Sequence, residues 1–192
     1  LVATLRREGR AAAWARAAGR SDDDAEATIM MLTPLVLRTD VANVYGRPLP
    51  AHLWSVLVDE PVETALRLDA ACVVVNLLQL PNESALHEQC LRNVAKLRAD
   101  CTRFGMPLMV EPLVMKGSGD AGYAVDGDAK KITALVRQAV ELGADVIKAD
   151  PTHDLAAFGD VVRTAAGVPV LVRGGGRDSE MAILRRTHEL MR

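Results

Sequence analysis

The sequence predicts an α/β protein in which a parallel sheet is covered by helices. Two observations support this class. Several short segments are apolar along their whole length, which is typical of strands that are buried on both faces. Amphipathic segments of helical length separate them, so that strand and helix alternate along the chain. Predicted strands start near residues 35, 72, 107, 145 and 168, and this regular recurrence favours a (β/α)8 TIM barrel.

Residues 1–33 are expected to form a helical segment that precedes a barrel domain at 34–192. Residues 1–20 carry five arginines and one glutamate among alanines, which indicates a solvated helix or a mobile basic arm. A second helix is expected to begin at Ser21, because its hydroxyl can cap the chain and acidic residues follow it.

The barrel domain is expected to open with a strand at 34–40, followed by a loop that contains Tyr45. Residues 53–58 are apolar but ambiguous, and a helix at 61–69 has proline in its first turn. Residues 71–78 form the most apolar and β-branched stretch, so they predict a buried strand.

In the second half of the chain, Asn82 is expected to begin a long helix that Gly105 ends. The apolar face of that helix contains Leu86, Cys90, Val94, Leu97 and Cys101. The remaining predicted elements are a strand at 106–112, a helix at 128–142, the strand that holds Lys148, a helix at about 154–166, a strand at 168–172 and a final helix capped by Asp178 or Ser179. An open doubly wound sheet is the competing architecture, but no GxGxxG motif opens a first strand–helix unit.

Composition excludes several function classes. The 192 residues are 49% hydrophobic and 25% charged, as in soluble globular proteins. A net charge of −2 and few aromatic residues (3%) argue against a nucleic-acid partner. No apolar run is long enough to cross a membrane and no signal-peptide pattern opens the chain. Three cysteines without a CxxC spacing predict reduced, buried thiols in a cytoplasmic protein.

Lys148 is the first candidate for chemistry. The chain has only five lysines against eighteen arginines, and Lys148 alone interrupts a predicted strand. Burying an ammonium group is costly, which favours the neutral, nucleophilic amine that forms a Schiff base with a carbonyl compound. The alternative is a lysine that ends a strand and extends its charge into water.

Other polar side chains fall where predicted strands end. They are Asp40, Asn76, Glu111 and Arg173, together with Lys148. The carboxyl ends of barrel strands carry the active site in proteins of this architecture. These five residues are therefore candidates for one shared site.

Three stretches then resemble a known family. They are Gly105–Met109 (GMPLM), Gly143–Lys148 (GADVIK) and Val168–Gly176 (VPVLVRGGG), and their order and spacing match from about Pro34 onward. The chain resembles the archaeal-type (DhnA-like) class I fructose-bisphosphate aldolases, in a superfamily with deoxyribose-phosphate aldolase and the LsrF-like enzymes. The resemblance implies a TIM barrel, no metal or other cofactor, a Schiff base on Lys148 in the sixth strand, a small phosphorylated carbonyl substrate and a homo-oligomer.

The resemblance also implies a phosphate site in the glycine-rich turn after the seventh strand. Backbone N–H groups of Gly174, Gly175 and Gly176 would bind the phosphate there, and such turns form anion sites on physical grounds as well. Arg173 and Arg177 flank the run and could add charge-assisted contacts. The alternative is a turn in which glycine serves backbone geometry alone.

The chain departs from the family on the fifth strand. The family places a tyrosine used in proton transfer where this sequence has Leu113. Glu111 is the ionisable group left on that strand, so we expect it to replace the tyrosine as acid/base with a raised pKa. Glu111 could equally be a salt-bridge partner of Lys148 or Lys116. Lys116 could instead bind phosphate, and Tyr45 is a weaker proton-transfer candidate.

The sequence is also short for a barrel, which typically needs about 250 residues. The first two strands and the eighth are not visible, so we expect that segments are missing and that a discontinuity lies within residues 1–34. Four histidines without ligand spacing argue against a metal-dependent aldolase. A Schiff-base lyase is the first functional expectation. An LsrF-like acyl or carbon–carbon transferase, or an inactive sugar-phosphate-binding barrel, remains open.

Overall fold

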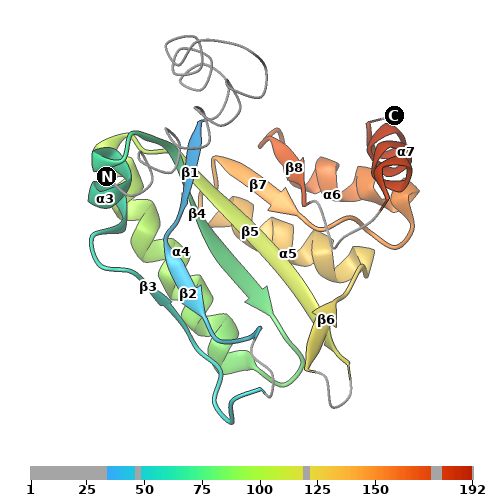
Figure 1. The fold of residues 1–192 in the computed structure, drawn as a ribbon, viewed down its shortest axis with the longest axis horizontal. Coiled ribbons are helices and arrows are strands. Elements are labelled where there is room, and N and C mark those ends of the chain that lie inside the picture. Colours follow the sequence, from blue (N-terminus) through green and yellow to red (C-terminus); the bar gives the residue numbers. More distant parts are fainter. Residues whose placement is uncertain (1–33, 46–48, 119–121, 174–178, 192) are drawn as a thin grey trace, which may run out of the picture.

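The computed structural model describes residues 34–45, 49–118, 122–173 and 179–191. Its main sheet contains five parallel strands: β1 (Leu35–Arg38), β4 (Ala70–Gln79), β5 (Leu108–Gly117), β7 (Val146–Ala149) and β8 (Val170–Val172). Their order in the sheet is β1-β4-β5-β7-β8, the same as their order in the chain (Figure 1). The predicted N-terminal helical segment and the expected discontinuity fall on residues outside the described ranges.

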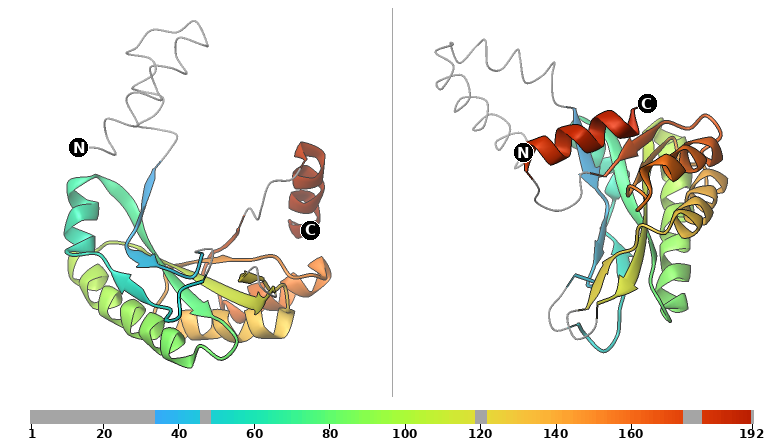
Figure 2. Two further views of the ribbon diagram at one scale, coloured as in Figure 1. Left: turned by 60° about the horizontal axis from the view of Figure 1, so that its bottom comes forward. Right: turned by 90° about the vertical axis from the view of Figure 1, so that its right-hand side faces the viewer.

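Helices connect successive strands of this sheet. They are α3 (Pro61–Arg67), α4 (Ser84–Phe104), α5 (Ala129–Glu141) and α6 (Phe158–Thr164), which follows a 3-10 turn at Leu155–Ala157; α7 (Glu180–Leu190) comes last. Figure 2 shows α3, α4, α5 and α6 as an arc along one side of the sheet. Sequential parallel strands with their helices on one side form the wall of a barrel, as predicted. In the part that the structure describes, β1 and β8 are the two edges of this wall.

The core lies between the sheet and its helices. Alternate residues of β4 point to this side, and Val73, Val75 and Leu77 are fully buried there. The predicted apolar face of α4 packs against them with all five of its residues buried. Gly105 ends α4 in the left-handed conformation (φ 67°), as its position in the sequence indicates.

Short elements were harder to predict than long ones. The strand expected at 34–40 ends at Arg38, and Asp40–Ala42 forms β2 of a separate antiparallel pair with β3 (Ser55–Leu57). The strand expected at 106–112 runs on to Gly117, where it pairs with an unforeseen strand β6 (Tyr123–Val125). Proline is uncommon inside sheets, yet β5 keeps its register with β4 through Pro112.

Helix starts were partly predicted. Asp128 caps α5 by accepting hydrogen bonds from the N–H groups of Lys130 and Lys131. Ser179 caps α7. The helix expected from Asn82 instead starts at Ser84, because Asn82 lies in a left-handed turn (φ 61°) before it. The three cysteines are free and buried, as expected. None of the described helices is both long and apolar enough to cross a bilayer.

We predict that Gly127→Ala destabilises the loop that follows β7. The carbonyl of Gly127 accepts a hydrogen bond from the backbone N–H of His153, and an added Cβ would lie 2.9 Å from that nitrogen. Overpacking of this kind costs about 2 kcal/mol. Urea unfolding measures the loss, and Gly117→Ala is the control because a Cβ there meets no described atom within 4 Å. Equal stability of the two variants would contradict this prediction.

Candidate active site

The face of the sheet turned away from the helices, which we call the inner face, carries two layers of side chains. Cys72 and Val74 of β4 form an apolar layer with Met109 of β5 and Val146 of β7. In the register of the sheet, Val74 is opposite Met109, and two residues further on Asn76 is opposite Glu111. Side chains two residues apart in a strand share a face. The second layer is therefore polar.

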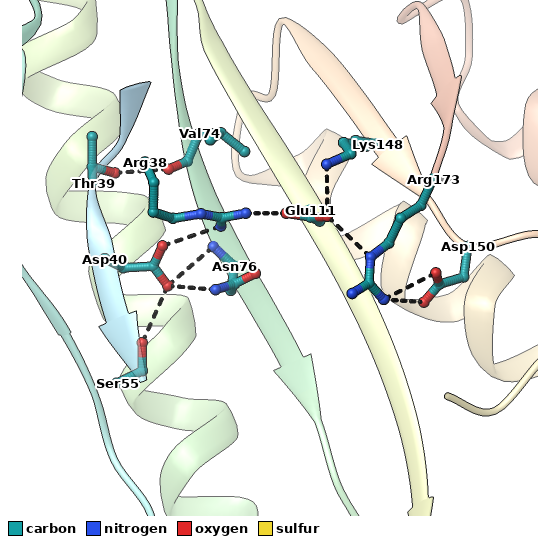
Figure 3. Close-up of polar contacts among 10 residues, drawn as sticks. All are labelled: Arg38, Thr39, Asp40, Ser55, Val74, Asn76, Glu111, Lys148, Asp150 and Arg173. Carbon is teal, nitrogen blue, oxygen red and sulfur yellow. Dashed lines mark hydrogen bonds and ion pairs between the residues drawn. The ribbon is translucent and has the colours of Figure 1, made fainter. Parts of the chain in front are cut away.

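Figure 3 shows this polar layer at the strand ends. The five candidate residues from the sequence lie there together with Arg38 and Asp150. Its charged members are Arg38, Asp40, Glu111, Lys148, Asp150 and Arg173, which we call the charge cluster. The cluster contains three cations and three carboxylates, so it is neutral when all six groups are ionised. The sequence prediction that polar strand ends converge is confirmed for Asp40, Asn76, Glu111, Lys148 and Arg173.

Glu111 is the centre of the charge cluster. Its side chain is 3% exposed and forms ion pairs with three cations. One carboxylate oxygen, Oε2, accepts a hydrogen bond from Arg38. The other, Oε1, lies 3.1 Å from Lys148 Nζ and 3.4 Å from Arg173 Nε.

The environment lowers the pKa of Glu111. Burial alone would raise it, but the hydrogen bond and charge of Arg38, followed by those of Lys148, outweigh the burial. The expected raised pKa of Glu111 is therefore wrong. Arg38 comes from β1, far away in the sequence, so the chain around Glu111 gave no sign of it. The alternative interpretation, an ion pair with Lys148, is confirmed.

Asp40 and Asn76 hold one side of the cluster. Asp40 Oδ2 accepts hydrogen bonds from the side-chain amide of Asn76 at 2.9 Å and from the hydroxyl of Ser55 at 3.4 Å. Its other oxygen lies 3.2 Å from Arg38 Nη1. Asp40 is 3% exposed, and both of its oxygens are engaged. The arrangement fixes the guanidinium of Arg38 between Asp40 and Glu111.

Asp150 holds the other side of the cluster. It is 2% exposed, and its Oδ1 lies 3.2 Å from Arg173 Nη1. Burial raises the pKa of Asp150, although the positive charge of Arg173 opposes the effect. The two carboxyl groups that flank Arg173 therefore have pKa values displaced in opposite directions.

Sequence reasoning missed Arg38 and Asp150. Asp150 resembled only a turn signal before Pro151, and Arg38 resembled the polar end of a strand. The available signal was their spacing: Arg38 stands two residues before Asp40 and Asp150 two residues after Lys148, which places each on the face of a known candidate.

The structure does not bring Lys116 to the charge cluster. Lys116 lies five residues beyond Glu111 on β5, about 16 Å along the strand at about 3.3 Å per residue, and its side chain is exposed. The predicted phosphate-binding residues Gly174, Gly175, Gly176 and Arg177 lie outside the described residues. Within the described ranges, no three histidine, cysteine, aspartate or glutamate side chains converge as a set of metal ligands.

Comparison with known sequences identifies relatives of the chain. A sequence model of the DeoC/LacD family of aldolases matches residues 10–191. An uncharacterised aldolase of Saccharolobus solfataricus is 30% identical over 143 residues, which are 73% of this chain and 51% of the relative. The 2-amino-4,5-dihydroxy-6-oxo-7-(phosphonooxy)heptanoate synthase of Streptomyces griseus is 32% identical over 152 residues, 77% of this chain and 50% of the synthase. The chain thus spans about half the length of these relatives.

Comparison with solved structures agrees. An archaeal fructose-1,6-bisphosphate aldolase, with its catalytic lysine covalently bound to the carbinolamine intermediate of the substrate, has a TM-score of 0.68 and 25% identity to this chain. The match covers 83% of this chain and 59% of that aldolase. The resemblance and the barrel fold predicted from the sequence are confirmed. Because the family match spans nearly the whole described chain and a solved aldolase shares its succession of strands and helices, this protein belongs to the DeoC/LacD family of aldolases.

Proposed function

We propose that this protein is a metal-independent aldolase that forms a Schiff base between Lys148 and the carbonyl group of a phosphorylated substrate. One observation carries the proposal. Lys148 Nζ lies 3.1 Å from a carboxylate that is 3% exposed, whereas the lysine side chain itself is 35% exposed. The lysine side chain is thus the part of this contact that is open to an incoming carbonyl compound.

Glu111 is the proposed proton-transfer group for imine formation. Its Oε1 lies 3.1 Å from Lys148 Nζ, so it is placed to take a proton from the Lys148 ammonium group and free the amine. The amine adds to the carbonyl carbon, and a proton passes from nitrogen to the new alkoxide oxygen to give the carbinolamine. Glu111 then returns its proton to the hydroxyl group of the carbinolamine. That hydroxyl leaves as water while the nitrogen lone pair forms the iminium bond. The carboxylate then faces the positive charge of the iminium group.

The proposed phosphate site adjoins this lysine. Arg173 directly follows β8, beside Lys148 on β7, and precedes the run Gly174–Gly176. A guanidinium group that precedes a glycine-rich run in the sequence suits a phosphate. Arg177 remains proposed as a further cation for the phosphate, and Asp40 and Asn76 as groups that orient Arg38 beside the substrate. Lys116 is not retained in this role, because it lies about 16 Å beyond Glu111 along β5. The phosphorylated compounds in the names of the similar synthase and aldolase support this substrate class.

Substrate-dependent inactivation by borohydride tests the proposal. Borohydride reduces an iminium bond to a stable amine, so it should inactivate the protein only when a bound carbonyl compound has formed the imine. We expect inactivation in the presence of fructose 1,6-bisphosphate or dihydroxyacetone phosphate, and cleavage activity that EDTA leaves unchanged. Loss of activity with EDTA would contradict the proposal. Absence of inactivation with a panel of phosphorylated ketones and aldehydes would favour the inactive binding barrel.

A further inference from the structure

We propose that Asp150 is a second catalytic carboxyl group, which carries the proton during cleavage and formation of the carbon–carbon bond. This inference rests on the proposed Schiff-base function and deepens it. It separates proton transfer at the nitrogen, where Glu111 lies, from proton transfer at the carbon chain of the substrate.

The position of Asp150 suits this role. It stands two residues after Lys148, immediately beyond the end of β7, so both side chains belong to the inner face. Two residues advance a strand by about 6.6 Å toward its carboxyl end. In a barrel, that end is where the substrate enters. A ketone bound to Lys148 would extend its carbon chain past this carboxyl group.

Asp150 is paired with fewer cations than Glu111. Arg173 Nη1 is its ion-pair partner, at 3.2 Å from Oδ1 and 3.5 Å from Oδ2. Glu111, by contrast, faces three cations, one of them the reacting lysine. Arg173 touches both carboxyl groups, so it can stabilise whichever of them is ionised.

Burial favours the neutral form of Asp150, whereas the cations around Glu111 favour its ionised form. Burial raises the pKa of Asp150, and the negative charge of Glu111 from β5 adds to the rise, while Arg173 from the end of β8 and Lys148 from β7 oppose it. Carboxyl groups whose environments displace their pKa values in opposite directions can divide acid and base roles. A phosphate dianion that binds Arg173 would bring negative charge toward Asp150. That charge would favour the neutral form of Asp150 further.

The proposed step balances. In the iminium complex, ionised Asp150 takes the proton from the hydroxyl group on the carbon that will become the aldehyde. The bond between that carbon and its neighbour breaks, and its electron pair neutralises the iminium nitrogen to give an enamine and a free aldehyde. Protonated Asp150 then gives its proton to the enamine carbon and restores the iminium group. Water hydrolyses this to the ketone and free Lys148.

Other proton carriers in the described part of the chain fit less well. Leu113, at the position of the family's tyrosine, has no ionisable group, and Tyr45 is 56% exposed. Thr152 donates its hydroxyl to the carbonyl of Asp154. Asp150, in contrast, is buried and ionisable and stands two residues after Lys148. The proposed imine formation does not require it.

The test separates imine formation from proton transfer to carbon. Dihydroxyacetone phosphate is incubated with the full chain in deuterated water. Borohydride trapping reports the imine, and mass spectrometry reports exchange of the carbon-bound hydrogen. For Asp150→Asn we expect trapping within about twofold of the unsubstituted protein and exchange reduced by about 100-fold or more. Asp150→Glu restores a carboxyl group and should recover part of the exchange. Its exchange rate should also still fall at low pH, as in the unsubstituted protein.

Asp126→Asn is the matched control. Asp126 is another buried carboxylate at a strand end, paired with Lys131 outside the charge cluster, and its loss should leave both signals in place. Normal trapping with unchanged exchange in Asp150→Asn would overturn this inference alone. An equal fall of trapping and exchange would also overturn it, because it indicates a positioning role. No trapping in the unsubstituted protein would contradict the proposed function itself.

Discussion

Replacement of Lys148 by methionine is expected to lower the rate of aldol cleavage by at least about 10⁴-fold, the scale on which loss of a covalent nucleophile acts. Methionine approximates the length of the lysine side chain but has no amine, so no imine can form. Glu111 keeps its contacts with Arg38 and Arg173 in this variant, and we therefore expect the fold to persist. Steady-state cleavage of the phosphorylated compound that supports borohydride inactivation measures the loss.

Lys130→Met is the control for this first variant. Lys130 lies on the exposed surface of α5, and its replacement should leave the rate unchanged. Urea unfolding of both variants checks that the lost activity is not lost structure. A Lys148→Met protein with even a few per cent of the original rate would contradict a covalent role for this lysine.

Replacement of Glu111 by glutamine is expected to reduce both activity and stability. The substitution removes the carboxylate on which Arg38, Lys148 and Arg173 converge, and it leaves those three cations facing one another. Breaking a buried ion pair costs about 3 kcal/mol, the low end of the usual range, because the cations keep part of their hydration. Urea unfolding at pH 7 measures this loss. Glu141→Gln, which breaks an exposed pair with Arg137, should change stability by less than about 0.5 kcal/mol.

The stability lost in Glu111→Gln should depend on pH in a defined direction. The pKa of Glu111 is lower in the folded protein than its ordinary value of 4.5, so the ionised form contributes stability above that value. The contribution falls as the pH drops below 4.5 and through the folded pKa. Unfolding midpoints of the two proteins should therefore differ at pH 7 and pH 6 and converge in acid. A difference that grows as the pH falls would contradict the role of Arg38 and Lys148 as its stabilising partners.

Sequence reasoning succeeded where a local pattern determines structure. The apolar, β-branched run of β4 and the 3.6-residue periodicity of α4 can each be recognised without knowledge of what packs against them. Lys148 could be found because a charged residue interrupts an otherwise apolar strand. Because parallel strands present their carboxyl ends on one edge, the meeting of Glu111, Lys148 and Arg173 also followed from the predicted order.

The remainder depended on contacts that are distant in the sequence. Arg38 reaches Glu111 across 73 positions, and this contact reverses the direction of the glutamate's pKa shift. The three-residue strands β2 and β3 pair only with each other and are too short to show periodicity. Asp150 is paired with Arg173, which comes from the next strand, so its sequence neighbours show only a turn.

The location of the trapped substrate tests the Schiff-base proposal most sharply. The protein is reduced with borohydride in the presence of dihydroxyacetone phosphate, digested, and its peptides are weighed. The proposal predicts that the mass of the reduced adduct appears on the peptide that contains Lys148, and that it disappears in Lys148→Met. An adduct on Lys116 or on another lysine, with the Lys148 peptide unmodified, would contradict it.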